Sequence, residues 1–498
     1  MTKYLIAFRN TNVTCYAKFL TLSAQKSLVH QNSVSNGGRR GSDRTDGRPM
    51  VYFGMPFFIK DPAPVVDGAL AELTVRSGSR SGKFSWHLLR KARVRATFMD
   101  SMVGNRCPES DIDPFSIEYL ASPHAPQARL RELGPVTYLP RYGFYVLARH
   151  TSVFAALRDP ENFCSGRGVG ITDFGKEAPW RPKSIINEAD APDHARPRTV
   201  MTRVLSKGVL EQLREDFKIA ARDIVDSALN MVTLDGIEDF AQAYPLRIIP
   251  DAVGMMSEGR ENLLPYGTMV FNAMGPHNEL FATSMQNSAP VIEWVTRQCR
   301  RESIAATGIG ARIYDEVDNG NLTEDEASML VRSVLSAGLD TTIFGLGHML
   351  HAFGQAPDQW QVLRADPSLI RAAWSEVIRL GSTVQSLFRT TTRPVEIDGV
   401  NIPANSKVML LLAAANRDPE KFTAPDRFDI RRKTMGHVGF GFGIHMCVGQ
   451  MLSTLEAEVL LEEMLPRIEK IELAGEPVWR LNNMLRGLQS LPIRFTVA

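Results

Sequence analysis

The segment from Glu324 to Gln355, EDEASMLVRSVLSAGLDTTIFGLGHMLHAFGQ, constrains the fold more than any other part of the chain. It has helical periodicity and is apolar around much of its circumference. A long helix of this kind is normally buried in the centre of a large fold. The chain of 498 residues is long enough to surround it, although length alone would suggest two or three domains.

The rest of the chain combines long helical segments with a few short strands. Residues 201–380 read mainly as helices, and two strand-like pieces, PVTYL and FYVLA, lie between residues 135 and 148. After Thr383, the stretch RPVEIDGVNI predicts two strands joined by an Asp-Gly turn. The last long helix is expected to begin at Cys447. We therefore predict a mainly α fold with small peripheral β-sheets.

The N-terminal residues differ from the rest in composition. Residues 1–100 carry 16 Lys and Arg against 6 Asp and Glu, a balance of +10 in a chain whose net charge is +2. Gly-, Ser- and Arg-rich stretches such as residues 36–49 are typical of flexible segments. We predict that residues 1–105 are a disordered extension or follow from a misassigned start, with Met99 or Met102 as the true one. A transit peptide, or a segment that touches nucleic acid or membrane, is the alternative.

The composition of the chain is that of a globular protein. Hydrophobic residues make up 44% of the chain and charged residues 22%. The sequence contains no run of about 18 apolar residues, so no membrane-spanning helix is expected. The five cysteines are odd in number and widely separated, which argues against a disulfide framework and favours a reducing compartment. No pair of them has the spacing of a zinc site. We expect a cytoplasmic protein.

One cysteine, Cys447, lies near the end of a glycine-rich stretch, FGFGIHMCVG, that precedes a helical segment. A thiolate is a good metal ligand, and a helix N-terminus lowers the pKa of a thiol. The glycines of this stretch lack side chains and let the backbone approach a flat, bulky group closely. A lone buried cysteine is more often an inert small hydrophobic residue. The metal-ligand interpretation therefore needs support from other motifs.

The stretch resembles the haem-binding loop of cytochromes P450. The positions that this pattern fixes are filled by Phe440, Gly443, His445, Cys447 and Gly449. The resemblance implies that Cys447 is the thiolate ligand of a haem b iron, with O2 as co-substrate. It also implies the cytochrome P450 fold, a triangular helical prism with small peripheral sheets, over residues 106–498.

A second stretch, EVIR from Glu376 to Arg379, resembles the Glu-x-x-Arg pair of the same family. The spacing of three residues puts both side chains on one helix face. Alone, this pattern has little value, because surface Glu/Arg pairs at this spacing are common. The resemblance implies a buried pair beneath the haem, with Arg427 as its further partner.

A third stretch, AGLDTT, interrupts the long apolar helix with polar residues. Glycine costs ~1 kcal/mol in a helix relative to alanine, and an unpaired acid in the core costs more. A tolerated polar kink is one interpretation. The other follows from resemblance to the distal helix of P450s, where Gly338 makes room for dioxygen, Thr341 offers a hydroxyl group and Asp340 delivers protons for O–O cleavage.

A fourth match concerns the haem propionates. His194 and Arg198 are four residues apart on one helical face, and a lone pair of this kind is more often solvated. In soluble bacterial P450s a similar stretch binds the propionates, for which charge-assisted hydrogen bonds are well suited. Arg389 and His445 are the third and fourth predicted partners by the same resemblance.

Several longer stretches, among them ENFCSGRGVGITDFGKEAPWRPKSII, resemble bacterial P450s that oxidise para-substituted benzoic acids, for example by O-demethylating methoxybenzoates. The predicted carboxylate partners are Arg181, Ser184, Arg332 and Ser333. The predicted ring slot consists of Phe271, Met274, Ser336, Val384 and Leu387. Met274 and Leu387 replace phenylalanines of that group and Asn187 replaces an aliphatic residue, which predicts a roomier or more polar slot.

The resemblance implies a monooxygenase that acts on an aromatic carboxylic acid. Its electrons would come from a [2Fe-2S] ferredoxin and an NAD(P)H-dependent reductase, with Arg203 and residues 431–433 as the docking face. We expect a monomer without nucleic acid or membrane partners. A P450 for a terpenoid or a fatty acid is one alternative. A non-catalytic haem binder is another, and the intact Asp340–Thr341 pair argues against it.

Overall fold

The computed structural model describes residues 5–7, 74–76, 107–179 and 181–498. The chain divides into two compact units, residues 1–100 and 101–498. In the first unit, strand β1 (Leu5–Ala7) pairs antiparallel with strand β2 (Thr74–Arg76). The rest of the predicted N-terminal extension, with both candidate start methionines, lies outside the described residues.

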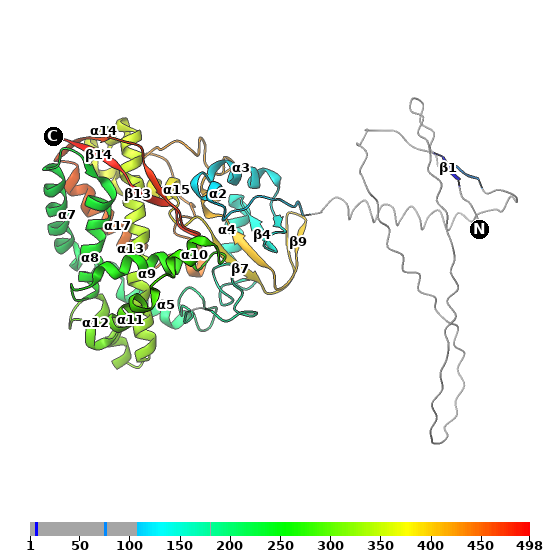
Figure 1. Ribbon diagram of the computed structural model, residues 1–498, viewed down its shortest axis with the longest axis horizontal. Helices are drawn as coiled ribbons and strands as arrows, with labels where there is room; N and C mark the ends of the chain where they lie inside the picture. The colour runs from blue at the N-terminus through cyan, green and yellow to red at the C-terminus, as the bar shows by residue number, and fades with distance from the viewer. Residues whose placement is uncertain (1–4, 8–73, 77–106, 180) are drawn as a thin grey trace, which may run out of the picture. The chain divides into compact units, whose positions relative to one another are not determined.

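The second unit is mainly helical, as the sequence predicts (Figure 1). A π-helix, η1 (Gly236–Gln242), leads directly into α8, and four short 3₁₀ turns are η2 (Arg260–Asn262), η3 (Arg301–Ser303), η4 (Pro367–Leu369) and η5 (Gly443–His445). The described α-helices are α2 (Ile117–Ala121), α3 (His124–Leu133), α4 (His150–Arg158), α5 (Ala195–Val204), α6 (Lys207–Gln212), α7 (Arg214–Leu229), α8 (Ala243–Val253), α9 (Leu263–Asn272), α10 (Glu279–Ser284), α11 (Ser288–Gln298), α12 (Ile309–Asp318), α13 (Glu324–Gln355), α14 (Pro357–Ala365), α15 (Ile370–Gly381), α16 (Leu412–Asn416) and α17 (Gln450–Met464).

The long apolar segment forms one continuous helix, α13, as predicted. Thr323 caps it, because its hydroxyl accepts a hydrogen bond from the Glu326 amide (3.2 Å) while the Glu326 carboxylate accepts one from the Thr323 amide (2.8 Å). Helices α8, α9, α12 and α15 all contact α13, so its apolar sides are covered from several directions. By length and composition α13 is apolar enough to cross a membrane, but 61% of its most apolar window is buried inside the fold, as in the core helix of a globular protein.

The strands form small sheets beside the helices. The largest has the order β3-β4-β10-β7-β5, and β10 runs parallel to β4 and antiparallel to β7. The others are β11-β14-β6, β12-β13 and β8-β9. Their bounds are β3 (Thr137–Leu139), β4 (Phe144–Leu147), β5 (Phe163–Cys164), β6 (Leu234–Asp235), β7 (Leu387–Thr391), β8 (Val395–Ile397), β9 (Val400–Ile402), β10 (Lys407–Leu410), β11 (Ile468–Leu473), β12 (Val478–Arg480), β13 (Gly487–Ser490) and β14 (Pro492–Val497).

Two local predictions about strands and turns are confirmed. PVTYL and FYVLA contain the paired strands β3 and β4. The predicted Asp-Gly turn joins β8 to β9, with φ of 46° at Asp398 and 82° at Gly399. A two-residue hairpin turn with positive φ at both positions has the twist that adjacent strands require.

The prediction that the last helix begins at Cys447 is wrong. Helix α17 begins at Gln450, with Gly449 as its N-cap. The Cys447 amide instead donates to the Phe440 carbonyl (2.8 Å), which closes the preceding loop on itself. Cys447 therefore belongs to this loop and lies just in front of the helix.

Figure 1 shows how these elements are grouped in the second unit. Helices α7, α8 and α17 lie beside α13 on one side, and α7 packs against α17 and α8. Helices α2, α3 and α4 lie with strands β4, β7 and β9 on the other side. The residues predicted to bind haem and to act in catalysis come from α5 with its N-cap, α13, β7 and the loop before α17.

Candidate functional site

The loop from Phe440 to Gly449 presents Cys447 on a tightly folded backbone. Gly443 has a φ of 73°, and a Cβ atom there would lie 2.4 Å from the Leu157 carbonyl oxygen, so no other residue fits without a rearrangement. The Met446 amide donates to the Gly443 carbonyl (3.1 Å), and the Cys447 amide to that of Phe440 (2.8 Å). The loop is therefore fixed by its own hydrogen bonds.

The thiol of Cys447 lies among protein atoms but is not covered on every side. Its side chain has accessible surface, and it is a free thiol like the three other described cysteines. Burial raises its pKa, although the backbone amides of Gly449 and Gln450 and the charge of Arg198 act in the opposite direction. These are the groups that favour a thiolate at this position.

Four basic side chains converge beside this loop from three segments: α5 with its N-cap, strand β7 and the loop itself. His194 is the N-cap of α5, Arg198 lies one turn further, Arg389 lies on β7, and His445 precedes Cys447 by two residues. The rings of His194 and His445 are 4.3 Å apart between centroids, and Arg198 donates to the Met446 carbonyl (2.5 Å). The structure thus brings together the four residues predicted to bind the propionates.

The electrostatics of this basic cluster are those of a site without its own anion. Burial, followed by the charges of Arg389, His194 and Arg198, lowers the pKa of His445 to about 3. Burial also lowers the pKa of Arg389 to about 10. The nearby carboxylate of Asp190 is engaged elsewhere, since it accepts from the amides of residues 165 and 166 at 2.8 and 2.9 Å.

Three ring nitrogens of the basic cluster are buried and have no hydrogen-bond partner in the described part of the chain. They are Nε2 of His194 and both Nδ1 and Nε2 of His445. Buried polar groups normally have partners, and each neutral imidazole carries one N–H group, so these rings can donate to an acceptor that the described part of the chain does not supply. The two propionates of a haem fit this requirement, because carboxylates accept charge-assisted hydrogen bonds from Arg and His.

On the facing helix α13, Asp340 and Thr341 are adjacent. The Thr341 hydroxyl donates to the Ala337 carbonyl one turn earlier (2.7 Å). A Cβ atom at Gly338 would meet no heavy atom within 4 Å, so protein side chains do not fill the space beside it. This combination leaves room for a small molecule next to a hydroxyl group.

Asp340 is a buried carboxyl group, with 3% of its surface exposed. Burial raises its pKa to about 7, although the charge of Arg480 acts in the opposite direction. Helix α9 passes so close that a Cβ atom at Gly267 would lie 2.1 Å from Asp340 Oδ2. A carboxyl group with this pKa holds and releases a proton near neutral pH.

Glu376 and Arg379 form the predicted buried pair, and both side chains are 0% exposed. Arg379 donates to Glu376 through Nε (2.7 Å) and Nη2 (2.9 Å), and its Nη1 donates to the carbonyls of Asn416 (2.7 Å) and Pro425 (2.8 Å). The predicted further partner, Arg427, is wrong. Arg432 fills that position, with its Nε 3.0 Å from Glu376 Oε1.

The Arg427 side chain is exposed, and only its backbone carbonyl takes part, as an acceptor from Arg432 Nη2 (3.0 Å). Arg432 also donates to the carbonyls of Thr423 and Ala424 at 2.6 and 3.0 Å. It therefore fastens the loop before α17 to Glu376. These contacts also remove Arg432 from the predicted docking face.

The residues predicted to bind the substrate carboxylate differ in whether they already have partners within the chain. Arg181 is paired with Glu188, with Nη1–Oε2 and Nη2–Oε1 distances of 2.9 and 3.2 Å, and the Ser184 amide donates to the same carboxylate (2.8 Å). On α13, Ser333 donates to the Met329 carbonyl (2.8 Å). None of the ion pairs among the described residues involves Arg332.

Tyr266 of α9 is a residue that the sequence did not reveal. It is buried, and burial raises the pKa of its phenol, while the charges of Arg332 and Arg181 act in the opposite direction. The charges of both arginines therefore act on the same phenol. No sequence pattern distinguishes this tyrosine from an ordinary core residue.

The residues predicted for the ring slot come from several segments. Phe271 lies in the last turn of α9 and belongs to the main hydrophobic core, and Met274 and Val384 pack against that core. Val384 and Leu387 also pack against the second hydrophobic cluster, around β10 and α4. Ser336 lies half-buried on α13. The predicted slot residues are thus divided between the main core, the second cluster and α13, with Val384 in contact with both clusters.

A mainly helical fold around one long buried helix, a cysteine loop before the last helix and a buried Glu–Arg pair together define a haem-thiolate class of protein. Comparison with known proteins identifies the family. A family model described as "Cytochrome P450" matches residues 263–495. "Cytochrome p450 CYP199A2" of Rhodopseudomonas palustris is 50% identical over 399 residues, which are 80% of this chain and 97% of the relative. The chain belongs to the cytochrome P450 family.

Other relatives support the same assignment. "Cytochrome P450 monooxygenase PikC" of Streptomyces venezuelae is 31% identical over 78% of this chain and 94% of the relative. The solved structure of cytochrome P450 CYP109Q5 from Chondromyces apiculatus has a TM-score of 0.66 and 32% identity, and covers 78% of this chain and 99% of that chain.

The protein is accordingly a monooxygenase, an oxidoreductase of the P450 type. Its family implies haem with thiolate-ligated iron and O2 as co-substrate. Bacterial members generally receive electrons from separate redox partners. The predictions of fold and enzyme class are confirmed.

Proposed function

We propose that this protein inserts one oxygen atom into an aromatic carboxylic acid, a para-substituted benzoate or a related compound, by hydroxylation or O-demethylation. The observation that carries this proposal is Arg332, a half-buried cation on α13 that has no ion-pair partner among the described residues and whose charge acts on Tyr266. A partly buried cation without a counter-ion favours an anionic ligand. In the reaction, two electrons and two protons are consumed and the second oxygen atom leaves as water.

The haem would be held by Cys447 at the iron and by the basic cluster at the propionates. Phe440 would pack beside the sulfur, while Gly443 and Gly449 leave space for the backbone to approach the ring. Bound there, haem supplies the iron at which O2 is activated. The unpaired nitrogens of His194 and His445 support this assignment.

Asp340 and Thr341 would supply the protons that oxygen activation at the haem consumes. Asp340 holds a proton at its carboxyl group near neutral pH, in line with its raised pKa of about 7. The Thr341 hydroxyl lies next along the helix and relays or positions that proton. A Thr341→Ala variant whose NADH consumption stays fully coupled to product would contradict this role.

The substrate carboxylate would be held chiefly by Arg332, with the Tyr266 hydroxyl as a donor. Arg181 contributes charge, but its guanidinium is already paired with Glu188, so a substrate would have to share it. Ser184 and Ser333 complete the predicted clamp. Hydrogen bonds to a charged group contribute about 1.5–3 kcal/mol each, which is enough to fix the orientation of a small acid.

The aromatic ring would lie among Phe271, Met274, Ser336, Val384 and Leu387. Methionine and leucine are more adaptable walls than the phenylalanines of the para-substituted benzoate group. The slot would therefore accept an acid with a larger or additionally substituted ring.

Electrons would come from a [2Fe-2S] ferredoxin reduced by an NAD(P)H-dependent reductase. Of the predicted docking residues, Arg431 and Lys433 are exposed, whereas Arg203 is paired with Glu316 (2.6 Å). Charge reversal at Arg431 and Lys433 would slow haem reduction by the ferredoxin, and an unchanged rate would rule out this docking face.

The experiment that tests the substrate is a titration of the haem-loaded protein with para-substituted benzoates, terpenoids and fatty acids. The change in the Soret band that accompanies loss of iron-bound water measures binding. We expect a response to the benzoates, weakened about 100-fold in Arg332→Leu because a buried charged contact is lost. A response to terpenoids or fatty acids, with none to benzoates, would overturn the proposal.

A further inference from the structure

A second cavity lies away from the cysteine loop, between the C-terminal part of α13, helix α15, residues 426–428 and strand β12. Its volume is about 390 Å³, within the range of sites for small molecules. Gln355, Asp358, Asp426 and Arg427 line it and are exposed, whereas His348 lines it and is 6% exposed. The cavity therefore runs from the surface to a buried base.

The buried part of this cavity carries nitrogens without hydrogen-bond partners. Within the described part of the chain they are Nδ1 and Nε2 of His348, Nδ1 of His124 and Nε of Arg417. The Arg417 Nε–H is always a donor, and each neutral imidazole carries one N–H group. His124 and His348 are neutral at neutral pH, since burial lowers the pKa of each to about 3. The base of the cavity consequently requires a hydrogen-bond acceptor.

The charges that line the cavity favour an anion. Three arginines, Arg417, Arg427 and Arg486, face two carboxylates, Asp358 and Asp426. Arg417 pairs with Asp426 (2.5 Å) and also donates to the Leu380 carbonyl (3.0 Å). One positive charge is left over, and a monoanion would balance it.

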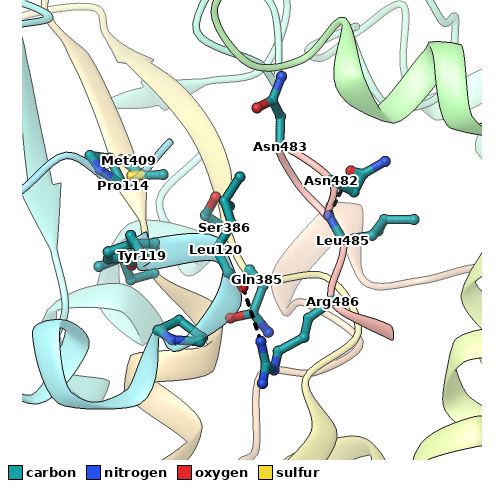
Figure 2. Close-up of a pocket in the computed structure, with 12 residues that line it drawn as sticks. Pro114, Tyr119, Leu120, Gln385, Ser386, Met409, Asn482, Asn483, Leu485 and Arg486 are labelled. Atoms are coloured by element: carbon teal, nitrogen blue, oxygen red, sulfur yellow. Dashed lines mark hydrogen bonds between the residues drawn. The ribbon is translucent and has the colours of Figure 1, made fainter. Parts of the chain in front are cut away.

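Arg486 is held in place by its other contacts. Its guanidinium carbon lies 3.8 Å from the centroid of the Trp479 ring, a cation–π contact. Its Nη1 donates to the Leu120 carbonyl (3.1 Å), and Figure 2 shows this bond from the neighbouring small pocket. The stacked arginine thus forms a fixed wall of the cavity.

The remaining lining residues are apolar or aromatic. Trp479 and Phe428 contribute rings, and Val377, Leu380 and Ala352 contribute aliphatic surface. No three potential metal ligands are grouped together in the described part of the chain, and this includes the histidines of the cavity. The lining is suited to an anionic head on an apolar body, and it does not resemble a metal site.

We propose that this cavity binds a small monocarboxylic acid, with its carboxylate toward His348, His124 and Arg417 and its apolar body along Trp479 and Phe428. The site is separate from the catalytic pocket and stands whether or not the proposed substrate is correct. It lies against α13 and α15, the helices that carry Asp340 and the Glu376–Arg379 pair.

The test is a calorimetric titration of the haem-loaded full chain with benzoate, with the Soret band followed in parallel. We expect two equivalents per chain, of which only one changes the Soret band. His348→Phe removes both ring nitrogens, and Arg427→Gln removes an exposed cation at the mouth. We call the equivalent of benzoate that does not change the Soret band the silent equivalent. Each substitution should weaken the affinity for the silent equivalent at least tenfold. Each should leave the affinity for the equivalent that changes the Soret band unchanged.

Matched controls are His277→Phe and Arg431→Gln, two exposed residues outside the cavity, which should change neither equivalent. Benzoate could also bind only once, without a change in the Soret band. If this binding is lost in Arg427→Gln, the cavity site is supported and only the proposed substrate is wrong. Absence of a silent equivalent, or one that persists unchanged in both cavity variants, would overturn the proposal. Equal binding of inorganic phosphate would overturn the assignment to a carboxylic acid with an apolar body.

Discussion

Two clusters of charged side chains in this protein differ in how their polar atoms are satisfied. In the network of Glu376, Arg379 and Arg432, carboxylate and guanidinium groups meet partners within the chain. In the basic cluster of His194, Arg198, Arg389 and His445, three buried ring nitrogens have no partner among the described residues. A satisfied network holds the fold together, whereas an unsatisfied one indicates a ligand-binding site.

The largest effect is expected from removal of the Cys447 thiol, which feels the charge of Arg198 in the basic cluster. Cys447→Ser replaces a thiolate ligand with a poor one, so we expect product formation to disappear and the absorption spectrum of the ferrous carbon monoxide complex to lose its thiolate character. Cys107→Ser, at a half-buried free thiol, is the matched control and should retain both. Retained product formation in Cys447→Ser would refute its assignment as ligand.

Disruption of the Glu376–Arg379–Arg432 network should lower the free energy of unfolding. Arg432→Gln leaves the buried carboxylate of Glu376 short of a partner, and we expect a loss of roughly 3–5 kcal/mol in the free energy of unfolding. Arg427→Gln, five residues earlier and exposed, should change it by less than about 0.5 kcal/mol. Chemical denaturation of both variants measures the difference. Equal effects would show that the network does not depend on Arg432.

Asp340 differs from both clusters because it is a single buried acid. Its pKa rises from 3.8 to about 7 on folding, so the folded state holds the proton more tightly than the unfolded state. The contribution of this group to the free energy of unfolding is fully present below about pH 4. It is lost as the pH rises through 7, and the total loss is about 4 kcal/mol. Asp340→Asn should therefore gain stability relative to the wild type from pH 4 to pH 8.

Denaturation curves at a series of pH values measure this effect, with Asp325→Asn, an exposed position on the same helix, as the control. A difference between Asp340→Asn and the wild type that does not change with pH would mean that the carboxyl group of Asp340 is not held protonated by burial.

The unsatisfied cluster should show the smallest change in stability and a change in haem affinity. His445→Gln keeps a hydrogen-bonding group but shortens its reach, and we expect haem to dissociate about tenfold faster, in line with loss of one charge-assisted hydrogen bond. Haem transfer to a scavenging apoglobin measures the rate. Arg431→Gln, exposed near the same loop, should leave it unchanged. Loss of global stability without faster haem release would make His445 a structural residue.

The sequence predicted the parts of the fold that depend on local pattern. The apolar periodicity of α13, the strands β3 and β4 and the Asp-Gly turn between β8 and β9 were all recognisable, because each depends on neighbouring residues. The spacing of Glu376 and Arg379 likewise put both on one face of α15.

Partners that meet across long loops were not predictable in this way. Arg427 and Arg432 have the same side chain and lie in the same loop, and only the path of the backbone decides which one reaches Glu376. The pairing of Arg181 with Glu188 and the effect of the Arg332 charge on Tyr266 also depend on tertiary packing. The start of α17 was misplaced because the Cys447 amide is used by the loop and not by the helix.

The most direct test of the account is the haem content and the ferrous carbon monoxide spectrum of the purified full chain, in the wild type and in a His194→Gln, His445→Gln double variant. We predict one haem per wild-type chain with a thiolate-type Soret band, and less bound haem in a double variant that folds normally. A wild type without a thiolate-type band, or a double variant that holds haem as tightly as the wild type, would contradict it.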